Sequence, residues 1–343
     1  MDVEVEDIER RALQGDSEAQ LALGRHFESQ EDMKLARGWY ARAAKQGSVA
    51  ALRSLAINLL THKPVVQSDG VNMLRSAADK GDAEAAYICG MLAAQDGDLD
   101  NRWRIARECL ERAAERGWAF ARAQLEFLGN DFHSSSGVAI PAGATEVRSV
   151  FESPRIDVIE RYIEPAICDW LIERARPRLS RAMVYDPATG RGRTEQARSN
   201  SSIAFNIAQS DLVFMLLRER IASTVGVALA NLEPSSVLHY SPGQQFEPHY
   251  DFLDPNVPGY AKDVAENGQR IATFLLYLND DYEGGETDFP KLGFRYKGRK
   301  GDALLFWNVT SSGDPEEQTL HAGRPTTAGE KWLLSQWLRQ PAR

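Results

Sequence analysis

VLHYSPGQQFEPHYDFLD, residues 237–254, carries the triplet His249-Tyr250-Asp251 near its C-terminal end. The stretch predicts a strand that turns at Ser-Pro-Gly and then enters a second extended run. Because side chains two residues apart on a strand point to one face, His249 and Asp251 can bind the same metal ion. A site of two histidines and one carboxylate needs a second histidine from a distant segment, and His321 is the candidate.

The composition excludes several classes of protein. The chain has 343 residues, which is enough for two domains. Its net charge of -9 at pH 7 gives no electrostatic support for binding nucleic acid or an acidic membrane. Three cysteines without a Cys-x-x-Cys pair indicate neither a disulfide framework nor a zinc site. The acidic N-terminus lacks a signal-peptide pattern, and no apolar run approaches the roughly 20 residues of a membrane span, so we expect a cytoplasmic protein.

A short motif that ends in glycine recurs in the first 130 residues. Its glycines, Gly15, Gly47, Gly81 and Gly117, are spaced 32, 34 and 36 residues apart, a period typical of helical-pair repeats. We expect each glycine to end a helix in the left-handed conformation. An alanine at the fourth position after each glycine and an apolar residue at the eighth predict one buried helix face. These residues are Ala19, Ala51, Ala85 and Ala121, then Leu23, Leu55, Cys89 and Leu125.

This pattern resembles the Sel1-like branch of the tetratricopeptide repeats, in about three units with a capping helix near residues 118–128. The resemblance implies that residues 1–130 form a helical array that binds a protein or peptide partner. A rigid platform or a dimerisation surface is the alternative, and the oligomeric state stays open. Residues 131–149 have the Ser, Gly, Pro and Ala content of a linker, and a second domain is expected over residues 150–343.

The second domain changes to extended runs rich in aromatic and β-branched residues. Helices first and a run of strands afterwards favour an antiparallel double-stranded barrel that is backed by helices. Helices are expected at residues 164–176 and 211–225, and strands at 154–162, 235–240, 270–279, 302–308 and 330–338.

Five segments of this domain closely resemble the prolyl 4-hydroxylase branch of the Fe(II)/2-oxoglutarate-dependent dioxygenases, and they occur in the family's order. The resemblance implies a double-stranded β-helix, or jelly roll, with supporting helices. The segments are LHYSPGQQFEPHYDF (238–252), GQRIATFLLYLND (268–280), YEGGETDFP (282–290), KGDALLFW (300–307) and LHAGRPTTAGEKWLLSQWL (320–338).

The resemblance also implies the cofactors and the residues that bind them. The iron ligands fall on His249, Asp251 and His321, and the basic residue for the distal carboxylate of 2-oxoglutarate falls on Lys331. A buried lysine ammonium is costly unless an anion meets it, which suits Lys331 to this role. A tyrosine hydroxyl near that carboxylate falls on Tyr277. The cofactors are then Fe(II), 2-oxoglutarate and O2, with ascorbate as the reductant.

The substrate-binding residues are less specified by the sequence. Residues 183–203 form a polar segment that contains glycine. In the family that the domain resembles, a mobile loop that closes over the peptide lies at this place in the chain. Arg198 matches the arginine that follows this loop, and Tyr240 and Trp337 are further candidates for the cavity wall. A solvated hairpin tip is the competing interpretation of the Arg198 segment.

We therefore expect a dioxygenase similar to the procollagen-proline 4-dioxygenases. It would hydroxylate a peptidyl residue, here proline, while 2-oxoglutarate is converted to succinate and CO2. The helical repeats would recruit the protein substrate. Two alternatives stay open: hydroxylation of a free amino acid or a small peptide natural product, and a repeat-based scaffold or oxygen-responsive binder with weak turnover.

Overall fold

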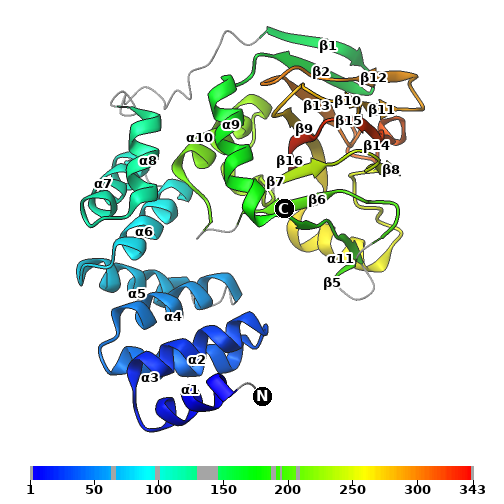
Figure 1. Cartoon of the computed structure of the whole chain (residues 1–343). Helices are drawn as coiled ribbons and strands as arrows, with labels where there is room; N and C mark the ends of the chain where they lie inside the picture. Colours follow the sequence, from blue (N-terminus) through cyan, green and yellow to red (C-terminus); the bar gives the residue numbers. More distant parts are fainter. Residues whose placement is uncertain are drawn as a thin grey trace. The chain divides into compact units, whose positions relative to one another are not determined.

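The computed structural model describes residues 3–62, 67–96, 101–129, 146–186, 191–193, 195–205 and 209–340. Backbone proximity divides the chain into two compact units (Figure 1). The first contains the N-terminal helices, and the second contains the strands with the remaining helices. Within the described residues, no helix combines the length and the apolar character that a membrane span needs.

The first unit is an array of helices in which each helix packs on the next along the chain (Figure 1). An all-helical array followed by strands agrees with the predicted order of the two fold classes. The helices are α1 (Val3–Leu13), α2 (Ser17–Ser29), α3 (Met33–Lys45), α4 (Val49–His62), α5 (Gln67–Asp79), α6 (Ala83–Gln95), α7 (Arg102–Glu115) and α8 (Ala119–Leu128).

The repeated glycines end helices as predicted, and the turn between α3 and α4 shows how. The Gly47 N–H donates to the carbonyl of Ala44, and the Ser48 N–H donates to the carbonyl of Ala43 at 3.2 Å, which is the hydrogen-bond pattern of a Schellman cap. Gly15, Gly47, Gly81 and Gly117 have φ of +97°, +92°, +99° and +88°, and a Cβ at any of them would have no atom within 4 Å. Backbone conformation, and not lack of space, therefore explains glycine at these positions.

The predicted buried face of each repeat is present. The alanines at the fourth position are 0–3% exposed, so neighbouring helices approach closely there. At the eighth position Leu23 and Leu55 are buried, whereas Cys89 and Leu125 are partly exposed. Burial of this face supplies the apolar area that holds the array together.

The first unit also includes a short segment from the second half of the chain. The Tyr87 hydroxyl donates to the carbonyl of Ser210, and the side-chain oxygen of Gln124 accepts the N–H of Leu212 at 2.8 Å. Leu212 is the first residue of α10 (Leu212–Val225). The sequence gives no local sign that this segment belongs with the helices of the first 130 residues.

The second unit is a double-stranded β-helix made of two antiparallel sheets (Figure 1). The large sheet runs in the order β1 (Glu146–Glu152), β2 (Arg155–Glu160), β13 (Ala303–Trp307), β9 (Arg270–Tyr277), β16 (Lys331–Arg339), β7 (Ser236–Tyr240), β6 (Ser201–Ala204) and β3 (Ser180–Arg181). The small sheet runs in the order β12 (Phe294–Tyr296), β11 (Thr287–Phe289), β14 (His321–Gly323) and β8 (Phe246–His249).

The core of this unit lies between the two sheets. Leu304, Leu333 and Tyr277 of the large sheet cluster with Phe289 of the small sheet, all at most 3% exposed. The residues of this cluster come from every second position of their strands, such as Leu304 and Phe306 of β13, as expected for packed sheets. The remaining elements are α9 (Pro165–Ala175), which contacts β7, α11 (Pro258–Asn267), and the short pairs β10 (Glu283–Gly284) with β15 (Thr326–Ala328) and β4 (Val184–Asp186) with β5 (Arg191–Arg193).

The five expected strands and the two expected helices of this domain are all found, within a few residues of the expected bounds. One expectation is wrong: residues 146–149, assigned to the linker, are part of β1, because they pair with β2 along a regular register. The rest of that linker, residues 131–145, lies outside the described residues. The extended run predicted around His249 is found as β8, whereas α11, which begins at Pro258, and the other strands of two to four residues were not predicted from the sequence.

Candidate active site

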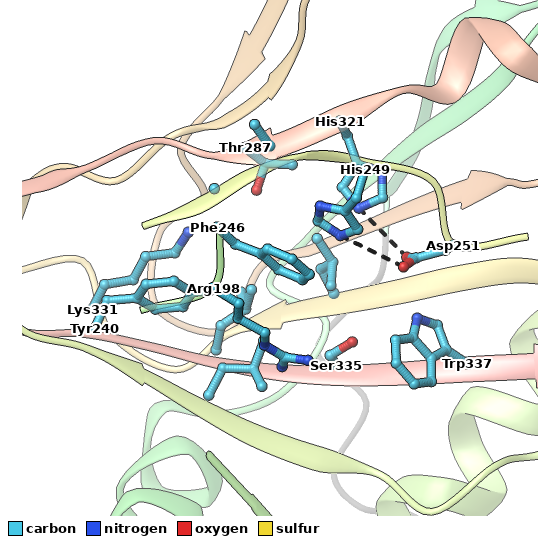
Figure 2. Close-up of a pocket in the computed structure, with 15 residues that line it drawn as sticks. Arg198, Tyr240, Phe246, His249, Asp251, Thr287, His321, Lys331, Ser335 and Trp337 are labelled. Carbon is cyan, nitrogen blue, oxygen red and sulfur yellow. Dashed lines mark ion pairs between the residues drawn. The ribbon is translucent and has the colours of Figure 1, made fainter. Parts of the chain in front are cut away.

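Two neighbouring strands bring the predicted metal ligands together. β8 ends at His249, β14 begins at His321, and the two histidines are direct cross-strand partners. Asp251 follows β8 by two residues. One ligand atom from each of the three side chains lies within 4.8 Å of the others, and no other group of three His, Cys, Asp or Glu side chains in the described part of the chain does so (Figure 2).

Backbone carbonyls fix the orientation of both imidazole rings. The Nδ1 atom of His249 lies 2.8 Å from the carbonyl of Glu247, and that of His321 lies 3.0 Å from the carbonyl of Thr319. A carbonyl only accepts, so each Nδ1 carries the proton and each Nε2 keeps its lone pair. The two Nε2 atoms lie 3.7 Å and 3.5 Å from the carboxylate oxygens of Asp251. These tautomers are the ones that bind a metal through Nε2.

A chain of buried polar groups holds the carboxylate of Asp251. The hydroxyl of Thr273 in β9 donates to Asp251 Oδ2 at 2.7 Å, and the amide of Asn308 donates to the Thr273 hydroxyl at 2.9 Å. Thr273 and Asn308 are both fully buried. The hydroxyl therefore has one acceptor and one donor with fixed directions, which sets the position of the carboxylate.

The protonation states of the cluster suit a cation. Burial, together with the neighbouring His321, lowers the pKa of His249 to about 3. Burial favours the neutral acid of Asp251, but His321, His249 and the Thr273 hydrogen bond outweigh it and hold its pKa below the ordinary value. A neutral imidazole and an ionised carboxylate are the forms that coordinate a metal ion.

Lys331 supplies a buried positive charge in the same pocket (Figure 2). It begins β16 opposite Tyr240 of β7, is 1% exposed, and donates from Nζ to the carbonyl of Gly285 at 2.6 Å. Burial lowers its pKa from 10.5 to about 8, although the charge of Glu286 opposes this shift. Its ammonium is hydrogen-bonded to a backbone carbonyl, which carries no net charge, so this charge is available for an anion.

The two predicted tyrosines lie differently. Tyr240 lines the pocket, and its ring lies 5.1 Å from the Lys331 ammonium (Figure 2). Tyr277 is fully buried behind the pocket wall, and its hydroxyl is 2.8 Å from the hydroxyl of Thr287. Thr287, not Tyr277, is the residue that faces the pocket here. Tyr277 is thus placed to hold Thr287, while Tyr240 lies in the pocket wall, where it was predicted.

A wider groove of about 660 Å³ opens from the metal-ligand cluster. Arg198 and Trp337 both line it, as does Asp251. The guanidinium of Arg198 lies 4.7 Å from the ring of Phe246, and burial lowers the pKa of this arginine. Trp337 is covered by Arg270 at 3.6 Å, and its indole N–H has no hydrogen-bond partner within the described residues. The groove is large enough for part of a peptide.

Sequence reasoning missed Thr273, Asn308 and Thr287. A usable signal existed for the first two, because each is a polar residue within or directly after an otherwise apolar strand, ATFLLY and ALLFWN. Such residues are buried and need a partner of their own. Thr287 had no such signal, because its strand of three residues is too short to show an alternation.

The comparisons with known proteins agree with this geometry. Residues 235–339 match the family model of the 2OG-Fe(II) oxygenase superfamily. The chain is 35% identical over 204 residues to prolyl 4-hydroxylase 1 of Arabidopsis thaliana, covering 55% of this chain and 70% of that protein. It is also 35% identical over 190 residues to prolyl 4-hydroxylase subunit alpha-1 of Rattus norvegicus, covering 55% of this chain and 35% of that protein.

Among solved structures, the chain is similar to a viral collagen prolyl hydroxylase from Paramecium bursaria Chlorella virus-1, with 28% identity and a TM-score of 0.41 over 54% of this chain and 95% of that one. The family assignment rests on the sequence matches. The match to the family model, over residues 235–339, includes His249, Asp251, His321 and Lys331. This chain therefore belongs to the prolyl 4-hydroxylase family of the 2OG-Fe(II) oxygenase superfamily.

Proposed function

We propose that this protein hydroxylates a proline residue of a peptide or protein, using Fe(II), O2 and 2-oxoglutarate. The observation that carries the proposal is a single pocket that joins the ligand cluster of His249, Asp251 and His321 to the buried ammonium of Lys331. The relatives named prolyl 4-hydroxylases support proline as the target.

The residues of the pocket fit these cofactors. Two imidazole nitrogens and a carboxylate on one side are the donor set of a ferrous oxygenase site and leave positions open for other ligands. At the other end, a Cβ at Gly285 would lie 3.2 Å from both the Lys331 side chain and the Thr326 hydroxyl. That hydroxyl is buried and has no partner within the described residues. The space and the unused polar groups around Lys331 therefore suit a carboxylate.

Each residue then has a separate task. His249, Asp251 and His321 would hold the iron, and Lys331 would bind the distal carboxylate of 2-oxoglutarate. When bound, the iron supplies, with 2-oxoglutarate and O2, the chemistry that forms succinate and CO2 and places a hydroxyl on the substrate carbon. Tyr240 and the rest of the apolar wall would exclude water from the pocket.

The groove beside the cluster is the proposed peptide site. Arg198 and Trp337 lie on its wall next to Asp251, so a proline placed there reaches the metal-binding face. Aromatic rings are common partners of extended proline-containing peptides, which supports Trp337 in this role. Arg198 offers donors for peptide carbonyls.

The helical unit would recruit the protein that bears the proline. Its repeat period and glycine caps support a Sel1-like array, and arrays of this kind present extended binding surfaces. A cytoplasmic location and a linker over residues 131–145 stay predictions from composition.

The test measures succinate release from 2-oxoglutarate by the purified full chain with Fe(II) and ascorbate, with and without proline-containing peptides. We expect release to rise when peptide is present and the peptide to gain the mass of one oxygen on proline. Free proline, offered in parallel, distinguishes a peptidyl hydroxylase from an amino-acid hydroxylase.

His249→Ala is the control, because it removes one ligand and leaves Lys331 and the groove in place. If wild type and His249→Ala release the same negligible succinate with every substrate, the catalytic proposal is wrong. Cell lysate adds a pool of unidentified proteins, and hydroxylation of a lysate protein that requires the intact helical unit would support recruitment.

A further inference from the structure

A short extended segment adds itself to the open edge of β8. The N–H of Glu247 donates to the carbonyl of Ala197 at 2.8 Å, and the N–H of Ser199 donates to the carbonyl of Gln245 at 3.0 Å. Arg198 and Phe246 are thereby opposite one another in an antiparallel bridge. Residues 197–199 thus act as an extra strand beside the strand that ends in His249.

Ser199 fastens this segment with its side chain as well. Its hydroxyl accepts the N–H of Gln245 at 2.8 Å and donates to the carbonyl of Gln245 at 3.1 Å. The bridge alone would leave the N–H of Gln245 without a partner. The Ser199 hydroxyl therefore completes the hydrogen bonding of both the N–H and the carbonyl of Gln245. We call Ser199 and its contacts with Gln245 the serine clamp.

The bridge sets the position of the Phe246 ring. Arg198 and Phe246 form a pair without hydrogen bonds between them, which is the arrangement in which opposite side chains approach most closely. The ring of Phe246 lies 4.7 Å from the Arg198 guanidinium on one side and stacks on the His249 ring at 3.6 Å and 17° on the other (Figure 2). Phe246 is therefore held between the clamped segment and the first metal-ligand candidate.

The backbone supplies a second connection to His249. The peptide carbonyl of Glu247 accepts from His249 Nδ1, and the N–H of the same residue donates to Ala197. Residues 197–199 thus hold the backbone of Glu247, and the carbonyl of Glu247 in turn sets the tautomer of the His249 ring. Both routes, through the Phe246 ring and through the Glu247 backbone, lead from Ser199 to His249.

We propose that Ser199 is a positioning residue for the metal site: the serine clamp sets the orientation of His249 Nε2 toward Asp251. The inference rests on the proposed function, because it takes His249 as a metal ligand. It goes beyond that function by assigning a role to a residue outside the ligand set, the Lys331 pocket and the groove wall. A ligand ring that is free to rotate binds a metal less tightly, and supporting contacts of this kind change affinity by about 10- to 100-fold.

The test compares Ser199→Val with Ser199→Thr in the full chain. Valine has nearly the shape of threonine but lacks the hydroxyl, so only the valine variant loses both contacts with Gln245. We expect Ser199→Val to bind Mn²⁺ about tenfold more weakly than wild type and to change the visible spectrum of bound Co²⁺. Ser199→Thr should restore both properties. Ser201→Val, the same change two residues along in β6, should leave both unchanged.

Three outcomes decide the proposal. Equal Mn²⁺ affinity and equal Co²⁺ spectra for wild type and Ser199→Val would overturn the clamp while leaving the metal site intact. Failure of wild type itself to bind Mn²⁺ would overturn the proposed function as well, so the two failures are distinguishable. If Ser199→Val does not fold, Ser199→Ala takes its place, because it removes the hydroxyl and both of its contacts with Gln245 without adding a methyl group. Unchanged Mn²⁺ binding by that variant would equally contradict the proposal.

Discussion

The proposed active site separates two kinds of charge. At one end, the carboxylate of Asp251 lies between two imidazoles whose outer nitrogens are fixed by backbone carbonyls. At the other end, the ammonium of Lys331 contacts a single carbonyl and two aromatic rings. A cation at the first end and a carboxylate at the second would each remove an unfavourable buried charge. This arrangement explains why a molecule that bears two acidic ends suits the pocket.

Because of Lys331, 2-oxoglutarate binding should weaken at high pH. Its pKa in the folded protein is about 8, so the ammonium that attracts the carboxylate is lost above that pH. We expect kcat/KM for 2-oxoglutarate to fall about tenfold for each pH unit above about 8. Lys331→Arg, which stays charged, should lose this fall even if its affinity is lower. A flat wild-type profile to pH 10 would contradict the assignment.

The same group should make the protein more stable as the pH rises. The folded pKa of about 8 lies below the ordinary 10.5, so between these values the unfolded chain binds more protons and the free energy of unfolding increases with pH. At pH 7 the buried ammonium of Lys331 lowers the free energy of unfolding by about 3 kcal/mol, at roughly 1.4 kcal/mol per pKa unit. Lys331→Met should therefore raise the unfolding free energy at pH 7 and abolish 2-oxoglutarate-dependent turnover. Denaturant unfolding at pH 7 and pH 10 measures the change in stability, and succinate release measures the loss of turnover.

Thr273 should matter for metal affinity although it touches no metal. Thr273→Val removes the donor to Asp251 and the acceptor of Asn308, whose buried amide would lose its partner. We expect about tenfold weaker Mn²⁺ binding and about 1–3 kcal/mol lower stability. Thr273→Ser keeps the hydroxyl and serves as the control in equilibrium dialysis and thermal unfolding. Equal metal affinity in the valine and serine variants would show that the hydroxyl has no such role.

At the scale of elements, pairing between β8 and β14 brings the two histidines together. The alternation around His249 predicted a shared face with Asp251, and the resemblance placed His321 and Lys331 in the same site. The sequence could not show that Thr273 reaches Asp251 and that Asn308 reaches Thr273, because these contacts depend on the register of β9 and on a residue beyond β13. It could not show the clamp either, because a single bridge over residues 197–199 has no periodicity.

The helical repeats allow a matched test of their glycines. Gly81 has a φ of +99° and Gly38 lies within helix α3, yet a Cβ at either position meets no atom within 4 Å. Gly81→Ala should destabilise the array by about 1 kcal/mol because alanine is strained at positive φ. Gly38→Ala should stabilise it by about 0.5–1 kcal/mol because alanine is the better helix former. Hydrogen-exchange mass spectrometry of the full chain reports both, and shifts of the same sign would contradict this explanation.

At the scale of the whole molecule, the two units are not successive in the sequence. The start of α10 belongs with the helical unit, and its first N–H is bonded to the fully buried Gln124. A truncation before the oxygenase segments would leave this helix start without its partner. Experiments on recruitment are therefore better done with point variants of the full chain than with deletions.

Gln124→Met tests this contact. Methionine keeps a similar size but offers no comparable acceptor, so the buried N–H of Leu212 would be left unpaired, at about 1–3 kcal/mol. We expect a lower unfolding temperature and, at temperatures where the variant is folded, unchanged succinate release per molecule. Gln124→Glu keeps an acceptor oxygen and is the comparison. A wild-type unfolding temperature for Gln124→Met would show that the contact contributes little.

The most direct test of the proposed metal site is the metal stoichiometry of the full chain, measured by anaerobic equilibrium dialysis against Fe(II) with and without 2-oxoglutarate. We expect one Fe(II) per chain for wild type, none for Asp251→Ala, and 2-oxoglutarate binding that is tighter with the metal than without it. We also expect one Fe(II) but weak 2-oxoglutarate binding for Lys331→Met. Equal Fe(II) binding by wild type and Asp251→Ala would contradict the assignment of His249, Asp251 and His321 as the metal site.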